Sequence, residues 1–332
     1  MEMLVHLAWL IGGLVLLSFG ADWLVRGASE LALKSGLKPL VIGLTVVAFG
    51  TSAPELIVSL KANLDPNTKA DIAIGNVVGS NICNIALMLG LAALMRPFVV
   101  GSQVVRRELP ILLVVTGAFI AMIWNGQLSR LEGSLMVVAI VAYVVTSIRI
   151  SRQHRGDPAE HDIPEEALAA AADHSLKGLL KSVGWVLLGL AALLFGADKL
   201  VTSGVVLAKQ MGVPELVIGL TLVALGTSLP ELATTIAAVK RGQMDLVAGN
   251  IIGSNLFNIL AVMGITAAAK PIEVEAMNPV NPVNLWVMGG VTLILVPFLA
   301  WGQKINRIEG GILVVGYLIY CTWLVVPQWF VF

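Results

Sequence analysis

The stretch Gly43–Glu55, GLTVVAFGTSAPE, decides the fold because the chain contains it twice. It returns as GLTLVALGTSLPE at Gly219–Glu231, and the two copies differ at only three positions. Each copy places Thr, Ser, Pro and Glu inside an otherwise apolar run. An ionisable side chain in such a run is costly if the run crosses a membrane. The repeat therefore predicts that these polar groups are kept for a purpose.

The composition is that of a membrane protein. The 332 residues are 57% hydrophobic and 13% charged, with a mean hydropathy of +0.89, whereas soluble domains carry about 25% charged residues. The formal net charge is zero and no basic block occurs, which excludes nucleic-acid binding on electrostatic grounds. Cys83 and Cys321 lie in apolar runs without CxxC spacing, so we expect buried thiols and neither a disulfide nor a metal site.

Ten apolar runs approach the length of about 20 residues that a spanning helix needs. We therefore predict an all-α polytopic membrane protein with ten transmembrane helices. The predicted spans cover residues 4–25, 37–60, 71–95, 108–124, 132–150, 178–200, 213–239, 245–269, 283–301 and 309–326. The polar segment between the fifth and sixth spans carries His154, His161 and His174, whose irregular spacing favours a solvated linker over a metal cluster.

The similarity between the two halves extends beyond the opening motif. GNVVGSNICNIALMLG at 75–90 returns as GNIIGSNLFNILAVMG at 249–264. We assign residues 1–150 to a first five-helix repeat, 151–177 to a linker and 178–332 to a second repeat. Because five is odd, the second repeat begins on the opposite side of the membrane, so the repeats are inverted. Inverted repeats with broken helices at the midplane are a plan of secondary transporters.

The distribution of Lys and Arg predicts the orientation. Most of these residues lie in or beside the loops that follow the odd-numbered spans. Positively charged loops stay in the cytoplasm. The linker 151–177 is therefore expected in the cytoplasm of a multi-pass inner-membrane protein, with both termini outside.

The first motif predicts a broken helix. Pro54 donates no backbone hydrogen bond and disturbs the carbonyl one turn earlier, near Gly50. Free carbonyls within a membrane are tolerated where they are buried in protein or line a polar cavity. Thr51 and Ser52 lie four and three residues before Glu55, so the three side chains can meet on one helix face.

A purely structural interpretation of the same residues exists. Ser52, Pro54 and Glu55 also match a capping box at the start of a new half-helix. We favour a functional role because a charged group at the centre of a span costs about 3 kcal/mol on insertion scales and occurs in both copies. Ser52 and its counterpart Ser228 are expected to do both.

The second motif supplies neutral oxygen atoms. Ser80 and Asn84 lie four residues apart, on one helix face, and Ser254 and Asn258 repeat the pair. Together with Glu55 and Glu231, brought together by the inversion, they form an oxygen-only set. Such a set suits hard cations such as Ca²⁺ and Na⁺ and disfavours Zn²⁺ or Cu. The charge of two carboxylates matches one Ca²⁺ or a small number of Na⁺ ions. A site that holds either kind of ion in turn is the minimum requirement for antiport.

Four further polar residues receive a structural interpretation. Asn81 and Asn255 lie one position off the Ser/Asn face, and hydrogen bonding between helices explains them as well as ion binding does. Asp22 and Asp198 lie near the ends of the first and sixth predicted spans, where we favour an interfacial role.

The paired GTSxPE motifs, each followed by GSNxxN, resemble the two α-repeats of the sodium/calcium exchanger branch of the cation/Ca²⁺ antiporter superfamily. The resemblance covers the whole chain apart from the linker. It implies ten spans, inverted topology and a central site where Na⁺ and Ca²⁺ are exchanged by alternating access. The ions would be transported substrates, so no cofactor and no enzymatic activity are implied.

The resemblance also implies roles for individual residues. Glu55 and Glu231 would be the Ca²⁺ carboxylates. The remaining implied ligands, through hydroxyl, amide or backbone oxygens, are Thr51, Ser52, Thr227, Ser228, Ser80, Asn84, Ser254 and Asn258, with the backbones of Ala48 and Ala224. Many relatives carry Asp at the position of Asn258, and in potassium-dependent members that Asp is tied to K⁺. Asn here argues against K⁺ cotransport, and the short linker argues against a regulatory Ca²⁺-binding loop.

Three other functions fit the same residues less well. A Ca²⁺/H⁺ antiporter is the closer alternative, because the two Glu side chains can take protons in place of Na⁺. An intramembrane hydrolase with Ser52 as nucleophile is remote, because the four His residues lie at the start of the first span or in the linker, and GTSAP does not match a GxSxG elbow. A channel fits less well than a carrier, since several close ligands favour binding over rapid escape.

Overall fold

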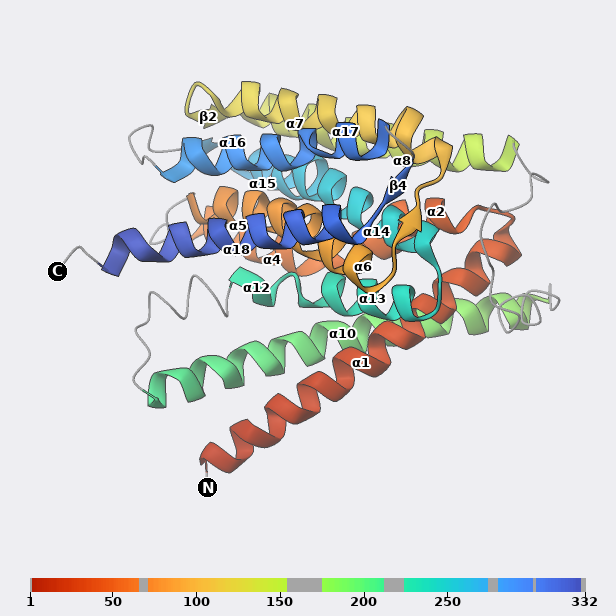
Figure 1. Ribbon diagram of the computed structural model, residues 1–332, viewed down its shortest axis with the longest axis horizontal. Coiled ribbons are helices and arrows are strands. Elements are labelled where there is room, and N and C mark those ends of the chain that lie inside the picture. The colour runs from red at the N-terminus through yellow and green to blue at the C-terminus, as the bar shows by residue number, and fades with distance from the viewer. Residues whose placement is uncertain are drawn as a thin grey trace.

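The computed structural model describes residues 2–65, 71–153, 175–211, 224–273, 280–300 and 303–329. These residues form a bundle of long helices with two short two-stranded sheets (Figure 1). Seven described helices are long and apolar enough to cross a membrane, or eight if one bent pair counts as a single span. The prediction of a helical, multi-pass protein is confirmed. The ten-helix count stays a prediction, because part of the predicted span 213–239 lies outside the described residues.

The first half of the chain contains α-helices, three π-helical segments labelled η, and two strands. In order they are α1 (Glu2–Ser35), α2 (Pro39–Ile42), η1 (Gly43–Val47), α3 (Ala48–Thr51), α4 (Ala53–Leu64), α5 (Asp71–Ile82), η2 (Cys83–Leu89), α6 (Gly90–Met95), β1 (Phe98–Val99), η3 (Val104–Glu108), α7 (Leu109–Ile123), β2 (Gln127–Leu128) and α8 (Arg130–Gln153).

The second half has the same kinds of element. In order they are α10 (Leu176–Gln210), α12 (Ala224–Gly226), α13 (Leu229–Lys240), α14 (Met244–Phe257), η5 (Asn258–Met263), α15 (Gly264–Ala269), β3 (Ile272–Glu273), α16 (Val280–Leu293), α17 (Leu295–Ala300), β4 (Lys304–Ile305) and α18 (Arg307–Trp329).

The predicted break in the first motif is present. The segment 39–51 and helix α4 meet at an angle of 44°. Ser52 sits at the break with φ −82° and ψ 7°, and Pro54 lies in the first turn of α4, where its missing N–H costs no hydrogen bond. In the second copy, Ser228 precedes α13 with nearly the same backbone angles. The part of that copy at 219–223 lies outside the described residues.

The expectation that the two serines cap the half-helices is wrong. Neither Ser52 nor Ser228 makes a capping hydrogen bond with its side chain. Both hydroxyl groups instead point to acceptors on the other half of the chain, described below. Each hydroxyl donates its proton to a carboxylate across the bundle, and its oxygen accepts no N–H bond from its own half-helix.

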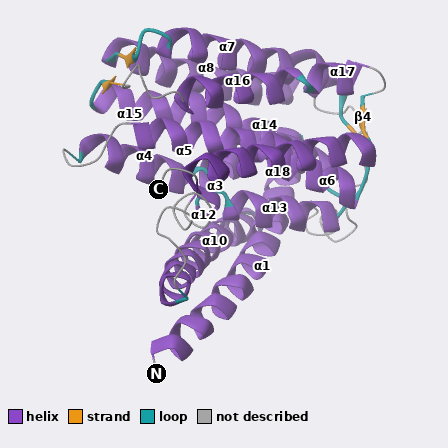
Figure 2. Cartoon of the chain, turned by 60° about the vertical axis from the view of Figure 1, so that its left-hand side comes forward, coloured by secondary structure: helices purple, strands orange, loops and turns teal. Residues whose placement is uncertain are grey.

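Helices α1 and α10 run antiparallel, side by side, along one edge of the bundle (Figures 1 and 2). They approach closely because glycines meet at the contact. A Cβ atom on Gly13 would lie 2.8 Å from the carbonyl oxygen of Gly196, and one on Gly20 would lie 2.9 Å from that of Gly189. Small residues at such positions allow membrane helices to pack backbone against backbone.

Both helices are longer than the predicted spans 4–25 and 178–200. The polar residues beyond the predicted end of α1 are satisfied by contact with α10. Lys34 Nζ donates to Ser182 Oγ at 2.9 Å, and Ser182 Oγ lies 2.9 Å from Glu30 Oε2. These groups lower the hydropathy at this end without ending the helix, so the hydropathy pattern placed the end of α1 too early.

The two small sheets pair one half of the chain with the other. In one sheet β1 pairs antiparallel with β4, Phe98 opposite Ile305. In the other, β2 pairs with β3, Leu128 opposite Ile272. The strands β1 and β3 follow the two copies of the second motif, so the pairing is reciprocal. The sheets lie at opposite ends of the bundle (Figures 1 and 2).

Glycine contacts show the same reciprocity. A Cβ atom on Gly310 of α18 would lie 2.7 Å from the carbonyl oxygen of Gly90, which begins α6. One on Gly133 of α8 would lie 2.7 Å from that of Gly264, which begins α15. Gly90 and Gly264 occupy equivalent places in the two halves, as do Gly133 and Gly310.

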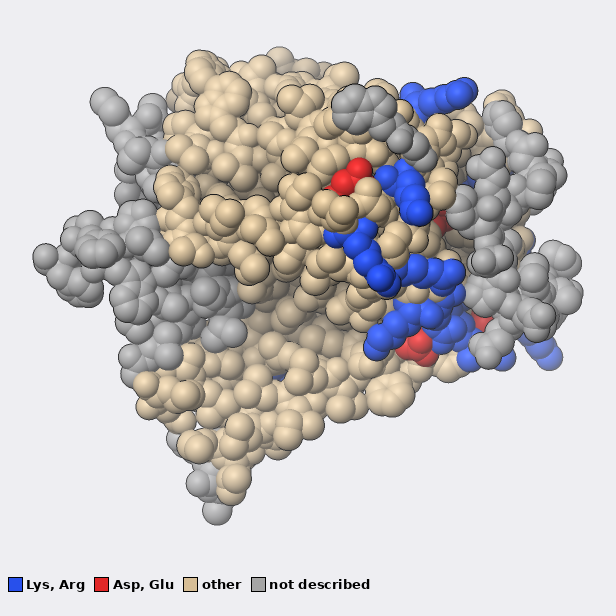
Figure 3. Space-filling view, in the orientation of Figure 1, with Lys and Arg blue, Asp and Glu red and all other residues tan. Residues whose placement is uncertain are grey.

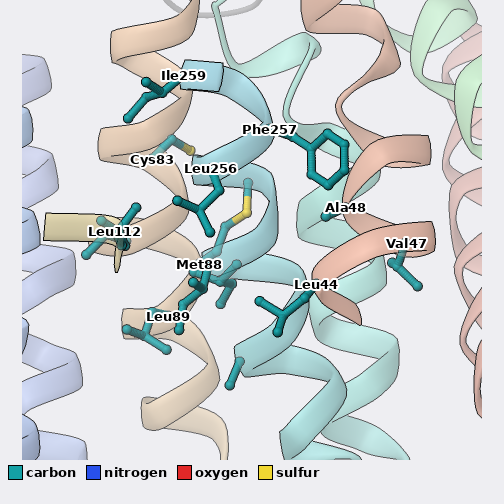
Figure 4. Close-up of a cluster of buried hydrophobic side chains, with 14 of the residues drawn as sticks. Leu44, Val47, Ala48, Cys83, Met88, Leu89, Leu112, Leu256, Phe257 and Ile259 are labelled. Carbon is teal, nitrogen blue, oxygen red and sulfur yellow. The ribbon is translucent and has the colours of Figure 1, made fainter. Parts of the chain in front are cut away.

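Buried apolar side chains gather where α14 crosses the segment before the break (Figure 4). A Cβ atom on Gly253 would lie 2.7 Å from the Cβ atom of Ala48 and 2.8 Å from the Cα atom of Leu44. The ring centroids of Phe49 and Phe257 lie 5.7 Å apart, with the two rings tilted by 59°. This close crossing holds the polar residues of both motifs in adjacent turns.

Candidate functional site

The two repeated glutamates occupy equivalent, fully buried positions. Glu55 lies in the first turn of α4 with 0% of its surface exposed, and Glu231 lies in the first turn of α13 with 1% exposed. Each sits beside the break that the motif creates. Carboxylates at such depth need partners that offset their lost hydration.

Glu55 is bonded from both halves of the chain. Its Oε1 atom accepts a hydrogen bond from Ser80 Oγ on α5 at 3.2 Å and from Ser228 Oγ at 3.4 Å. The hydroxyl groups of Ser228 and Ser80 also lie 3.1 Å apart. These contacts bring two predicted residues of the first repeat together with one of the second.

Glu231 receives the converse bond. Its Oε1 atom accepts from Ser52 Oγ at 3.3 Å. Each carboxylate is therefore bonded by the serine that precedes the half-helix of the other repeat. The crosswise arrangement makes one site out of the two motifs.

Several buried polar atoms in this region have no hydrogen-bond partner among the described residues. Both carboxylates contribute one: Glu55 Oε2 and Glu231 Oε2. Three predicted neutral ligands, all fully buried, contribute others: Ser254 Oγ, Asn258 Oδ1 and both polar side-chain atoms of Asn84, Nδ2 and Oδ1. Buried polar groups are rarely left unbonded in native proteins. Nearly all of these atoms are oxygens, which are the ligands of hard cations.

The threonines of the motifs contact two residues that sequence reasoning missed. Thr227 Oγ1 donates to Asn76 Oδ1 at 3.3 Å, and Thr51 Oγ1 lies 3.5 Å from Asn250 Oδ1. Asn76 Nδ2 in turn donates to the backbone carbonyl of Glu55 at 3.2 Å. A signal was available, because both asparagines stand at the same place in the repeated GN of the second motif.

The predicted backbone ligands lie one turn before the break. The carbonyl of Ala48 accepts a hydrogen bond from the Ser52 amide at 3.0 Å, and Thr51 Oγ1 lies 3.4 Å from it. It therefore keeps its intrahelical bond, and a cation there would share this oxygen. Ala224 begins α12, in the equivalent position before Ser228.

The two equivalent asparagines, Asn84 and Asn258, are held differently. The amide nitrogen of Asn258 donates to Ser80 Oγ and to Asn81 Oδ1, both at 3.1 Å. The side chain of Asn84, by contrast, has no partner among the described residues. Asn258 is thus tied to the hydroxyl that also bonds Glu55, and this asymmetry was not predictable from the repeat.

The two residues next to the Ser/Asn face are held differently. Asn81 Nδ2 donates to the carbonyl of Asn255 at 3.4 Å and lies 3.8 Å from the sulfur of Met288. Asn255 Nδ2 donates to the carbonyl of Ile251 within its own helix at 2.9 Å. The contacts of Asn81 agree with hydrogen bonding between helices, whereas the side chain of Asn255 bonds its own helix.

Asp22 and Asp198 are not part of the site. Asp22 pairs with Arg241 at 2.6 Å, and Asp198 pairs with Lys199 at 3.1 Å. Their side chains are 47% and 60% exposed, in agreement with an interfacial role. The three histidines of the linker lie outside the described residues.

No soft-metal site competes with the oxygen cluster in the part of the chain that is described. There, no three His, Cys, Asp or Glu side chains gather in a way that could hold a metal ion. Cys83 and Cys321 are both free thiols; Cys83 is buried, as predicted, whereas Cys321 is only partly buried. His6, the histidine within a described helix, contacts Ser203 of α10 at 3.4 Å, so it offers no base for the remote hydrolase alternative at Ser52.

Comparison with known proteins agrees with the motifs and with the arrangement. The family model of the sodium/calcium exchanger protein matches residues 5–149 and 181–326. The inner membrane protein YrbG of Escherichia coli (strain K12) is 39% identical, over 98% of each chain. The sodium/calcium exchanger MaX1 of Methanosarcina acetivorans is 34% identical, over 94% of this chain and 96% of that protein.

Solved structures give the same result. The sodium-calcium exchanger NCX_Mj, in a form without Na⁺ and Ca²⁺, superimposes with a TM-score of 0.81 at 29% identity, covering 97% of this chain and 99% of that one. Another structure of the same exchanger, soaked with Na⁺ and Ca²⁺, superimposes with a TM-score of 0.79. MaX1 and NCX_Mj are exchangers, which carry ions as substrates and are not enzymes. The chain accordingly belongs to the sodium/calcium exchanger protein family, as a membrane antiporter of the cation/Ca²⁺ class.

Proposed function

We propose that the protein exchanges Na⁺ for Ca²⁺ across the membrane by alternating access to one central site. One observation carries the proposal. Glu55 and Glu231 are buried at the starts of two half-helices, and each is bonded by the serine of the opposite half, Ser228 or Ser52. Each also keeps a second carboxylate oxygen without a protein partner among the described residues.

The ligand set supports a hard cation. Glu55 and Glu231 are the carboxylates that bind Ca²⁺. The neutral oxygen ligands are Thr51, Ser52, Ser80, Asn84, Thr227, Ser228, Ser254 and Asn258, with the carbonyls of Ala48 and Ala224. Six to eight oxygen ligands satisfy Ca²⁺, and nitrogen or sulfur donors, which select other metals, are not needed.

Charge explains why two ions share one site. Removing an uncompensated carboxylate from water costs several kcal/mol, so the site with two of them is stabilised by bound cations. One Ca²⁺ or a small number of Na⁺ ions can balance both charges. Because the two ions compete for the same oxygens, loading one requires release of the other, which is the basis of exchange.

We further propose the ten-span arrangement of two inverted repeats, residues 1–150 and 178–332, joined by the linker 151–177. The reciprocal strand pairs, β1 with β4 and β2 with β3, support it. So do the reciprocal glycine contacts of α6 with α18 and α8 with α15. A twofold relation between inverted halves predicts contacts of this kind.

Alternating access is supported by an unequal contact. Helix α1 packs along α13, whereas the equivalent pair of the other half, α10 and α4, does not pack in this way among the described residues. A site between two related halves is reached from one side when the contact on the other side is closed. Exchange of the two contacts switches access to the site from one side of the membrane to the other.

The orientation proposed from the charges places the linker in the cytoplasm and both termini outside, in an inner membrane. The excess of Lys and Arg in the odd-numbered loops supports it. The relative in Escherichia coli is named an inner membrane protein. The neutral side chain of Asn258 supports exchange without K⁺.

Transport in sealed vesicles tests the driving ion. The purified protein is reconstituted into liposomes loaded with Na⁺, and uptake of radioactive Ca²⁺ is followed after dilution into Na⁺-free buffer. We expect uptake with the Na⁺ gradient and none with a pH gradient of equal size at constant, symmetric Na⁺. Protein-free liposomes with a Na⁺ ionophore control for leak.

The opposite result supports the rival function. Uptake driven by the pH gradient alone, and unchanged when K⁺ or choline replaces Na⁺, would make the protein a Ca²⁺/H⁺ antiporter. Glu55 and Glu231 would then carry protons on the return step. Uptake under neither gradient contradicts both forms of antiport.

A further inference from the structure

A groove of about 620 Å³ runs between α1 and α13. Its inner part is lined by apolar side chains, among them Leu14, Leu17 and Leu232. Its outer end is lined by Asp22, Lys240 and Arg241, where α13 ends and the chain turns back into the bundle. The groove is therefore apolar along its length and charged at one end.

The charged end is basic. Arg241 Nε donates to Asp22 Oδ1 at 2.7 Å, so these two charges neutralise each other. Lys240 is exposed and has no ion-pair partner among the described residues. The guanidinium group of Arg96 lies close by, 2.9 Å from where a Cβ atom on Gly242 would be. Figure 3 shows Lys and Arg side chains gathered on this face around an acidic group.

The equivalent surface of the other half differs in volume and in charge. Ala233 and Ala237, which line the groove, correspond to Ile57 and Lys61 on α4. Lys240 corresponds to Leu64. The second half therefore has small residues where an acyl chain can lie and a cation beyond them where a headgroup can sit. The first half has larger side chains along this stretch, one of them Lys61, and an apolar residue at the position of Lys240.

We propose that this groove binds one anionic phospholipid, with an acyl chain along the apolar part and the phosphate group at Lys240. The apolar part alone does not choose between lipids, since every bilayer lipid has acyl chains. The choice rests on the unpaired ammonium group, because a Lys near an anionic lipid surface contributes about 1 kcal/mol, or about fivefold in affinity. The loop that holds Lys240 is expected on the cytoplasmic side.

A lipid in this groove contacts α1 and α13, the two helices whose relative movement the proposed function requires. Its chain would lie between α1 and α13, and α13 begins with the residues that lead to Glu231. A bound lipid therefore stabilises the state in which α1 and α13 are in contact. This consequence rests on the proposed exchange function, whereas the binding itself does not.

Lipid retention by the purified full-length protein tests the binding. Native mass spectrometry is carried out after delipidation and incubation with phosphatidylglycerol or phosphatidylcholine of identical acyl chains. We expect preferential retention of phosphatidylglycerol, reduced about fivefold by Lys240→Gln and unchanged by Lys61→Gln, an exposed lysine on the other half-helix. Ala237→Trp is expected to remove retention of the lipid, and Ile57→Trp, on the outward face of α4, is its matched control.

Three results would overturn the proposal. One is equal retention of phosphatidylglycerol by the wild type and by Lys240→Gln. Another is displacement of the lipid by inorganic phosphate at ordinary concentrations, which would make the end of the groove a simple anion site. The last is a change of oligomeric state in Ala237→Trp but not in Ile57→Trp, which would make the groove a contact between two copies. If the wild type fails to exchange ions, these binding results still decide the proposal.

Discussion

The half-helices α4 and α13 begin alike and end differently. Each follows a serine at a break, has Pro in its first turn and buries a Glu there. From the second turn on they diverge, with exposed Ile57 and Lys61 on α4 where α13 has Ala233 and Ala237. The likeness lies where both halves contribute to one ion site. The difference lies where each helix faces its own side of the membrane, with its own lipids and loops.

Replacement of either carboxylate is the strongest test of the likeness. Glu55→Gln and Glu231→Gln each keep the shape and remove one of two buried charges, so we expect Ca²⁺ exchange to fall about a hundredfold or more in both. Vesicle uptake of radioactive Ca²⁺ measures this, and size-exclusion chromatography checks folding. Exchange retained in both variants would refute their role as ligands, and a large inequality would break the equivalence of the halves.

Replacement of Asn84 and Asn258 by Asp tests whether these two equivalent residues have the same role in the site. Asn258→Asp removes two donated hydrogen bonds and adds a charge beside Glu55, whereas Asn84→Asp adds a charge without losing a described bond. At about 1 kcal/mol for each of the two bonds, we expect Asn258→Asp to change the relative preference for Na⁺, K⁺ and Ca²⁺ by up to about thirtyfold without abolishing exchange.

Competition of Na⁺ and K⁺ with Ca²⁺ uptake measures the preference. An ion profile identical to that of the wild type would count against the assignment of Asn258 as a site residue. The Asn84→Asp variant separates the effect of charge from the effect of the lost hydrogen bonds.

Gly50 and Gly226, which precede the two breaks, test whether the two halves pack alike against α10. A Cβ atom on Gly50 would lie 2.5 Å from a terminal methyl group of Leu190, and one on Gly226 would lie 2.4 Å from a methyl group of Val201. Leu can rotate away, whereas a β-branched Val is held at χ1. Gly226→Ala should therefore destabilise by about 1–3 kcal/mol, the range for overpacking, and Gly50→Ala by less.

Thermal unfolding in detergent measures these differences. Gly184→Ala is the control, because no other atom lies within 4 Å of its added Cβ, and it should leave the unfolding temperature unchanged or raise it. Equal losses in Gly50→Ala and Gly226→Ala would contradict the argument from side-chain stiffness.

The crosswise serines give the smallest expected effect. Ser228 Oγ lies within hydrogen-bond distance of Glu55 and Ser80, whereas Ser52 Oγ bonds Glu231 alone. We expect Ser228→Ala to raise the Ca²⁺ concentration for half-maximal uptake about fivefold, the effect of about 1 kcal/mol per bond, and Ser52→Ala to raise it less. A larger effect of Ser52→Ala would mean that these bonds do not set the affinity.

Much of the site could be predicted from the repeated motifs, because the free-energy cost of burying a charge depends mainly on the residue and on its apolar neighbours in the sequence. A Glu after Ser-x-Pro in an apolar run is unfavourable wherever the run ends up, so Glu55 and Glu231 stand out without coordinates. Asn76 and Asn250 were overlooked for a related reason. An uncharged amide in an apolar run is only moderately costly, and its partner, a threonine of the other half, is far away in the sequence.

The expected capping role failed because it used local geometry alone. Ser52 and Ser228 have the spacing of a cap, but the acceptor that each hydroxyl reaches lies on the other half of the chain. The end of α1 was misjudged for the same reason, since Glu30 and Lys34 are unfavourable in a hydropathy window and are satisfied by Ser182 in the packed pair.

By itself, then, the sequence determined the membrane class, the doubled motif, the break at Ser52 and the residue types of the site, because hydropathy, proline geometry and the cost of a buried carboxylate act over a few neighbouring residues. Only the tertiary structure decided which serine meets which carboxylate, that Asn258 is tied to Ser80 while Asn84 is not, and that α1 packs on α13 with an apolar groove between them that is basic at one end. Those contacts join residues more than a hundred positions apart, and their energies exist only after the helices have packed.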